Sequence, residues 1–159
     1  GRLGVDLVET LRRELFPRAH VITLGLAEAE LFAGSSIRCA DDAREALRRI
    51  RGDSGNWVFL AGSADLTSAR DVVFDGEQFF ELDAAHEWTG ERREALSAAV
   101  AARLALGQGR LAAIEGAKAF VDNAVAHSFA VGAGRPLPHH LFERWRVRSS
   151  AQGEKESGQ

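Results

Sequence analysis

Hydrophobic and polar residues follow two repeat lengths along the first part of the chain, and each predicts a different kind of element. Apolar residues at positions 5, 8, 11 and 15 have helical spacing, and Pro17 closes that helix. The apolar runs at residues 20–24 and 56–61 are short and predict buried strands. Between these strands, residues 27–32 predict a short helix that Gly34 ends.

The next elements complete the predicted fold class. Asp42 and Glu45 have the capping-box spacing of a helix through Ile50. Helices thus alternate with strands, which favours an α/β fold with a mostly parallel central sheet and flanking helices. Further on, Asp75-Gly76 separates two alternating apolar runs, and this dipeptide predicts a β-hairpin.

The second half of the chain predicts two long helices. Leu96, Val100 and Leu104 form one apolar stripe, and Gly107 ends that helix. A second helix is predicted over residues 110–130. The charged stretch before Leu96 has two interpretations. It is an anion site at a helix N-terminus, or the polar entry to an ordinary core helix.

Composition narrows the class of protein. The chain has 159 residues, of which 45% are hydrophobic and 27% are charged, and its formal net charge is −3. We therefore expect one domain over residues 1–148, a disordered tail over residues 149–159, and no nucleic-acid or membrane partner. Cys39 is the only cysteine, which excludes a disulfide within the chain and favours a reducing compartment, here the cytoplasm.

Five phrases of the sequence, in order, resemble the hydroxymethylpyrimidine/phosphomethylpyrimidine kinase family. The first phrase covers residues 13–31, and its part Thr23-Leu-Gly-Leu-Ala-Glu-Ala-Glu30 is similar to the family's Thr-Pro-Asn-Leu-x-Glu-Ala-Glu. The other similar phrases are residues 71–76, 96–107, 117–121 and 132–140. The resemblance implies a ribokinase-like fold with a partial central sheet, of which this chain would be the C-terminal part. It also implies ATP and Mg²⁺ as cofactors, and phosphorylation of a pyrimidine precursor of thiamine.

The family's anion hole is altered in this sequence. Counted back from Ser97, the Thr-His-Gly-Thr-Gly-Cys of the family aligns with residues 89–94, which read Thr-Gly-Glu-Arg-Arg-Glu. Glycines let phosphate approach the backbone closely, so charged side chains there change the site. In this register Glu94 is the candidate catalytic base, and Thr89, Gly90 and Arg92 are candidate ATP-binding residues. In a shifted register Glu91 is the base instead.

At the other positions that match family residues, some residue types are the same as in the family and some differ. Gly25 stands where the family has Asn, and Leu60 stands where it has a phosphate-binding Lys. Glu28 is kept and is either a metal-linked carboxylate or a solvated charge of a first helical turn. Lys118 matches a family lysine near the nucleotide, and is otherwise a solvated helix lysine. Gly62, after the second strand, completes the ATP-binding candidates.

Two hypotheses about function follow from this pattern. The first is a phosphomethylpyrimidine kinase-like protein of thiamine biosynthesis with a small-molecule pyrimidine substrate. The alternative is an inactive or truncated relative that acts as a nucleotide-binding or protein-interaction domain. A sugar or nucleoside kinase of the same superfamily fits the phrases less well. In either case, a partial sheet leaves an edge that favours a homo-oligomer or a partner that completes the sheet.

Overall fold

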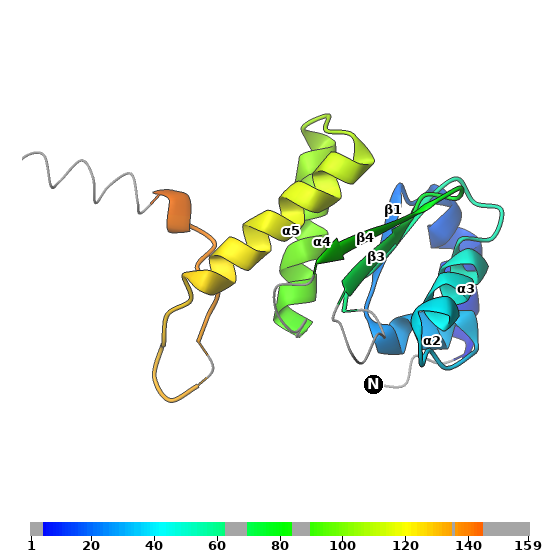
Figure 1. Ribbon diagram of the computed structural model, residues 1–159, viewed down its shortest axis with the longest axis horizontal. Coiled ribbons are helices and arrows are strands. Elements are labelled where there is room, and N and C mark those ends of the chain that lie inside the picture. The colour runs from blue at the N-terminus through cyan, green and yellow to red at the C-terminus, as the bar shows by residue number, and fades with distance from the viewer. Residues whose placement is uncertain (1–4, 63–69, 84–89, 135, 145–159) are drawn as a thin grey trace, which may run out of the picture. The chain divides into compact units, whose positions relative to one another are not determined.

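The computed structural model describes residues 5–62, 70–83, 90–134 and 136–144 (Figure 1). The helices are α1 (Val5–Thr10), η1 (Leu11–Leu15), η2 (Phe16–Arg18), α2 (Leu26–Ala33), α3 (Ala40–Arg51), α4 (Gly90–Ala105) and α5 (Arg110–Ala126). The strands are β1 (Val21–Leu24), β2 (Trp57–Leu60), β3 (Arg70–Phe74) and β4 (Phe79–Asp83). The chain divides into two compact units, Gly1–Ser97 and Ala98–Gln159, which we describe separately. The prediction of one domain over residues 1–148 stays a prediction.

The first unit contains a four-stranded sheet in the order β1-β2-β3-β4. Strands β1 and β2 are parallel, whereas β2 pairs with β3, and β3 with β4, in antiparallel fashion. The α/β class is confirmed, but the described sheet is mixed and not mostly parallel. The Asp75-Gly76 hairpin joins β3 and β4, so these two strands are antiparallel. Only β1 and β2, which are connected through α2 and α3, form a parallel pair in the described sheet.

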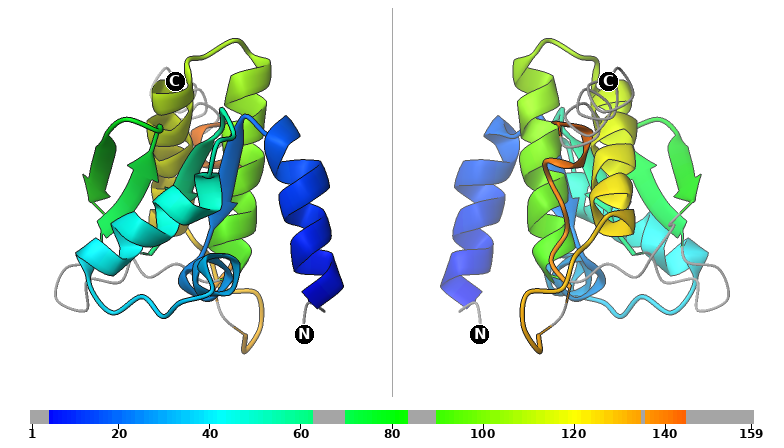
Figure 2. Two further views of the ribbon diagram at one scale, coloured as in Figure 1. Left: turned by 90° about the vertical axis from the view of Figure 1, so that its right-hand side faces the viewer. Right: turned by 90° about the vertical axis from the view of Figure 1, so that its left-hand side faces the viewer.

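Helices α2 and α3 pack together, and α3 covers β2 and β3. Figure 2 shows both helices on the same side of the strands. Four fully buried side chains dominate the core between these layers: Ala29, Leu47, Val58 and Leu60. Gly34 ends α2 with a φ of +70°, a left-handed conformation that favours glycine, as the sequence predicts.

The start of α3 differs from the prediction in one respect. The N-cap residue is Cys39, and Asp42 lies inside the helix. The Asp42 carboxylate accepts the backbone N–H of Arg38 at 2.9 Å, which lowers the pKa of Asp42. Asp42 thus stabilises the helix entry from the first turn, because a carboxylate there satisfies a backbone donor that precedes the helix. Glu45 instead pairs with Arg49 at 3.0 Å on the surface.

The predicted hairpin is confirmed, with Asp75 and Gly76 in its turn. The Asp75 carboxylate accepts the N–H groups of Glu77 and Gln78 at 2.7 and 2.8 Å, and Gly76 has a φ of +111°. At the other end of the hairpin, Glu81 accepts hydrogen bonds from the guanidinium groups of Arg70 and Arg44 at 2.8 and 2.7 Å. The hydrogen bond from Arg70 lowers the pKa of Glu81 most, followed by the one from Arg44. The two bonds also connect β4 to β3 and to α3.

The second unit consists of the remainder of α4, the helix α5 and a C-terminal segment. Figure 2 shows α4 and α5 side by side, and the Arg103 guanidinium lies over Gly116 of α5. Helix α5 ends at Ala126, short of the predicted residue 130, because Phe129 instead pairs in a β-bridge with Leu137. Phe142 is 5% exposed and anchors the last described turn. The predicted tail over residues 149–159 lies outside the described residues.

No helix in the described ranges is both long and apolar enough to cross a membrane.

Candidate functional site

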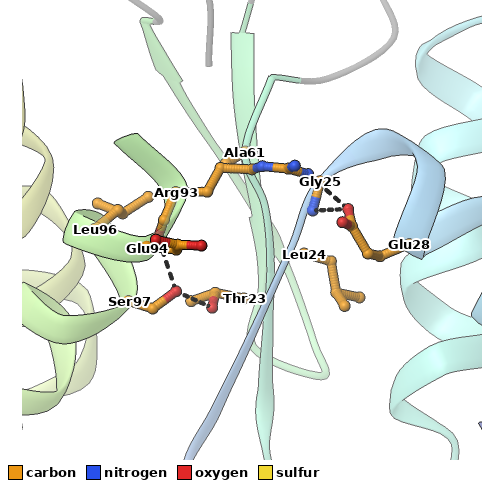
Figure 3. Close-up of a pocket in the computed structure, with 9 residues that line it drawn as sticks. All are labelled: Thr23, Leu24, Gly25, Glu28, Ala61, Arg93, Glu94, Leu96 and Ser97. Atoms are coloured by element: carbon orange, nitrogen blue, oxygen red, sulfur yellow. Dashed lines mark hydrogen bonds and ion pairs between the residues drawn. The ribbon is translucent and has the colours of Figure 1, made fainter. Parts of the chain in front are cut away.

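A cleft of about 460 Å³ lies at the carboxyl ends of the two parallel strands of the first unit. Strand β1 ends at Leu24 and β2 ends at Leu60, and the N–H of Ala61 continues the pairing by donating to the Leu24 carbonyl at 2.9 Å. The cleft is lined by Thr23, Leu24, Gly25, Glu28, Ala61, Arg93, Glu94, Leu96 and Ser97 (Figure 3). In open α/β sheets, ligands bind at this end of the strands, where side chains from neighbouring loops and helix starts converge.

Two helices begin at the cleft. Helix α2 starts directly after Gly25, and the first turns of α4, which begins at Gly90, carry Arg93 and Glu94. A helix N-terminus has free N–H groups and the positive end of the helix dipole, so two such ends favour an anion. Helix α4 already begins at Gly90, so Arg92, Arg93 and Glu94, which belong to the charged stretch before Leu96, are helical.

An ion pair connects the two helix starts. The Nη1 atom of Arg93 donates to Oε2 of Glu28 at 2.7 Å, and the backbone N–H of Gly25 donates to the same oxygen at 3.0 Å. Glu28 therefore caps α2 from its first turn and pairs with Arg93, and its role toward a metal stays a prediction. The side chains of Arg93 and Glu28 are 34% and 39% exposed, so both can be reached from the cleft.

A chain of hydroxyl groups fixes α4 against the end of β1. Ser97 Oγ donates to the carbonyl of Arg93 at 3.0 Å, and it lies 2.7 Å from Oγ1 of Thr23. Because the single proton of Ser97 is used by the carbonyl, Thr23 is the donor in the second bond. Ser97 thus packs α4 against β1, and its bonds set the position from which Arg93 reaches Glu28.

The charges in the cleft decide which ligands suit it. Its lining contains one guanidinium, of Arg93, and two carboxylates, of Glu28 and Glu94. Within the described part of the chain, no group of three or more His, Cys, Asp or Glu side chains could hold a metal ion on its own. Mg²⁺ in nucleotide sites needs only one or two carboxylates, because phosphate oxygens and water complete its shell. The donor set therefore fits Mg²⁺ bound together with a phosphate chain, and the excess carboxylate makes a cation favourable.

The structure brings two of the predicted site residues together at one cleft. Glu28 and Glu94 face the same cleft (Figure 3). Arg92 and Gly62 do not line it, and the Gly62 N–H donates to the buried carboxylate of Asp71 at 2.6 Å. Gly90 is the first residue of α4, whereas Thr89 and the side chain of Glu91 lie outside what the structure describes. Leu60 is fully buried, so the position of the family lysine is part of the core.

Lys118 belongs to α5, in the second unit. Its side chain is only 9% exposed, and Nζ donates to Asp122 Oδ2, one turn later, at 3.1 Å. A lysine with so little exposure is unusual on a surface helix. Lys118 is therefore not the solvated helix lysine of one interpretation, and its role at a nucleotide stays a prediction.

From the sequence, Gly25 and Arg93 are two separate differences from the family phrases, and nothing predicts a contact between them. A Cβ on Gly25 would overlap Nη1 of Arg93, so a side chain at residue 25 and the guanidinium of Arg93 would compete for the same space. Local spacing does indicate part of the site. The three-residue step from Gly25 to Glu28 is that of a helix cap and its N3 carboxylate. Nothing in the local sequence indicates the partner from α4.

Comparisons with known proteins agree with this geometry. The family model described as phosphomethylpyrimidine kinase matches residues 3–139. A hydroxymethylpyrimidine/phosphomethylpyrimidine kinase of Rhizobium meliloti (strain 1021) is 36% identical over 150 residues, covering 90% of this chain and 56% of that protein. One of Synechococcus elongatus is 38% identical over 150 residues, covering 87% of this chain and 57% of that protein. The chain thus spans little more than half the length of these curated relatives.

Solved structures give the same assignment. The ADP complex of a Bacillus subtilis pyridoxal kinase superposes with a TM-score of 0.76 and 30% identity, covering 90% of this chain and 58% of that one. The fold is therefore the ribokinase-like α/β fold that the resemblance implies. The family match covers most of the chain, and its relatives bear the name that the five phrases predict. This chain belongs to the phosphomethylpyrimidine kinase family.

Proposed function

We propose that this chain carries the phosphate-transfer end of a kinase that phosphorylates hydroxymethylpyrimidine or its phosphate with ATP. The observation that carries the proposal is the cleft itself. Two helix N-termini and the guanidinium of Arg93 meet at the ends of two parallel strands. This arrangement suits the phosphate chain of ATP, because phosphoryl transfer depends mainly on positioning and on neutralising charge.

Each lining residue has a distinct part in the proposed reaction. One Nη1 hydrogen of Arg93 is used by Glu28, and the other guanidinium N–H groups donate to phosphate oxygens. Glu28 is the carboxylate that holds Mg²⁺, which when bound screens the negative charge of the phosphates. Glu94 accepts the proton of the acceptor hydroxyl. The oxygen of that hydroxyl forms a bond to the γ-phosphorus of ATP. The bond from that phosphorus to the β–γ bridging oxygen breaks, and ADP leaves.

Phosphoryl transfer by the folded chain tests this proposal directly. We expect ADP and a phosphorylated product when the chain is mixed with ATP, Mg²⁺ and hydroxymethylpyrimidine, whose hydroxyl is the acceptor group that Glu94 would deprotonate. The Glu94→Gln variant should lower the rate by about 10²- to 10⁴-fold, the usual contribution of a general base. Product and ADP are quantified by phosphorus NMR, and pyridoxal serves as a comparison acceptor because a pyridoxal kinase shares the fold.

The matched control is Glu45→Gln, which removes a carboxylate from a surface pair on α3 and should leave the rate unchanged. A chain that is folded by circular dichroism but forms no product with either acceptor contradicts kinase activity of this chain. Turnover that Glu94→Gln leaves intact contradicts the role of Glu94 and turns attention to Glu91.

A further inference from the structure

Gly25 has no backbone reason to be a glycine. Its φ and ψ of −91° and 176° are extended values that any residue adopts. Gly34, at the other end of α2, differs because its φ of +70° favours glycine. The absence of a side chain at residue 25 must therefore be explained by space and not by conformation.

The space beside Gly25 is filled by Arg93. A Cβ on residue 25 would overlap Nη1 of Arg93, and it would lie 2.8 Å from Cζ of Arg93 and 2.6 Å from Oε2 of Glu28. Such distances are far inside van der Waals contact, so even alanine would displace the guanidinium. Figure 3 shows the guanidinium reaching from α4 past Gly25 to Glu28.

Arg93 is directed to this place by bonds at both of its ends. Its carbonyl accepts the hydroxyl of Ser97, which is tied to Thr23 of β1, and its Nη1 donates to Glu28. Oε2 of Glu28 accepts both this guanidinium and the N–H of Gly25. Two donors from two different helix starts therefore fix the orientation of one carboxylate.

We propose that Arg93 takes the place of a side chain at residue 25 and is the positioning residue of Glu28. The guanidinium holds Oε2, so that the second carboxylate oxygen, Oε1, is directed to a cation bound with the phosphates. The positioning role rests on the proposed kinase function, whereas the exchange of space between residues 25 and 93 does not. In the ungapped register the two positions are departures from the family phrases, Gly for Asn and Arg for Gly, and on this account they compensate each other.

A double-mutant cycle on stability tests the exchange of space. In the wild-type background, Gly25→Ala expels the guanidinium from Glu28 and lowers the midpoint of urea unfolding. In the Arg93→Ala background, the same substitution meets only the carboxylate of Glu28, which can shift, so it lowers the midpoint less than in the wild type. An equal effect of Gly25→Ala in both backgrounds overturns the proposal.

Calorimetric titration of ATP at stepped Mg²⁺ concentrations tests the positioning role. Gly25→Ala, which removes no charge, should raise the half-saturating Mg²⁺ concentration roughly tenfold, the scale of one hydrogen bond to a charged group. The Gly25→Asn/Arg93→Gly double variant, with the family's residue types, should restore a value near that of the wild type. Arg49→Ala, which breaks a comparable surface ion pair, should leave it unchanged.

The two tests separate the possible failures. An unchanged Mg²⁺ requirement in Gly25→Ala, with ATP still bound, overturns the positioning role. A folded wild-type chain that binds no ATP at any Mg²⁺ concentration contradicts the proposed function, and with it the positioning role. In that case the stability cycle still decides whether Arg93 occupies the space beside residue 25, because it compares the effect of Gly25→Ala on the unfolding midpoint with and without Arg93.

Discussion

Replacing Leu47 with alanine lowers the free energy of unfolding by about 2–5 kcal/mol, the range for truncating a fully buried leucine. Leu47 is 0% exposed and belongs to the core between α3, α2 and the sheet. The cost combines the lost transfer of apolar atoms from water with the cavity that the shortened side chain leaves. Urea unfolding followed by circular dichroism measures the change.

Leu31→Ala is the matched control, because Leu31 lies on the neighbouring helix α2 and is 44% exposed. We expect it to lower the free energy of unfolding by less than about 1 kcal/mol, as partly exposed sites usually do. If the two variants were destabilised equally, the α3 side of the sheet would not be the core described above.

Replacing Arg93 with glutamate weakens binding of Mg·ATP by roughly 10- to 100-fold or more. Loss of the charge-assisted hydrogen bonds alone accounts for about 1.5–3 kcal/mol. The substitution also leaves three carboxylates and no guanidinium in the described lining of the cleft, which adds repulsion between the carboxylates and phosphate. Isothermal titration calorimetry of the folded variant gives the affinity.

Arg49→Glu controls for the change in net charge, because Arg49 lies on the outer surface of α3, where it pairs with Glu45. Its effect on ATP binding should be smaller than about twofold at physiological salt, where distant surface charges are screened. If the Arg93→Glu variant bound Mg·ATP as tightly as the wild type, the result would contradict phosphate binding in the cleft.

Most of the fold could be predicted from the sequence because its signals are local. The apolar runs at β1 and β2, the Asp75-Gly76 turn and Gly34 each specify one element through spacing or turn chemistry. The antiparallel attachment of β3 to β2 could not be predicted, because it depends on pairing across the sheet. The start of α4 at Gly90 was missed because residues 89–94 were compared with a glycine-rich loop, although glutamate and arginine are good helix formers.

The candidate site was predictable only in part, because its key contact is not local. Glu28 and Glu94 were identified from a family pattern, and both line the cleft. The bond from Arg93, the residue before Glu94, to Glu28 joins positions 65 apart. It also depends on the empty space at Gly25, which becomes visible only when the two helix starts are placed in three dimensions.

Association of the chain stays a prediction. In the described sheet β1 is an edge strand, with β2 as its neighbour. Ile22 and Leu24 of this edge strand are buried. An edge strand of this kind is commonly paired or covered, by a second copy of the chain or by a partner that completes the sheet.

Amide NMR of the labelled chain during titration with Mg·ATP tests the central claim most directly. The account predicts that the amide signals of Gly25, Ala61 and Arg93 shift most strongly and that those of the hairpin turn at Asp75 and Gly76 stay in place. Strong shifts confined to residues outside the cleft, or no shifts in a folded chain at saturating Mg·ATP, would contradict a phosphate site between the starts of α2 and α4.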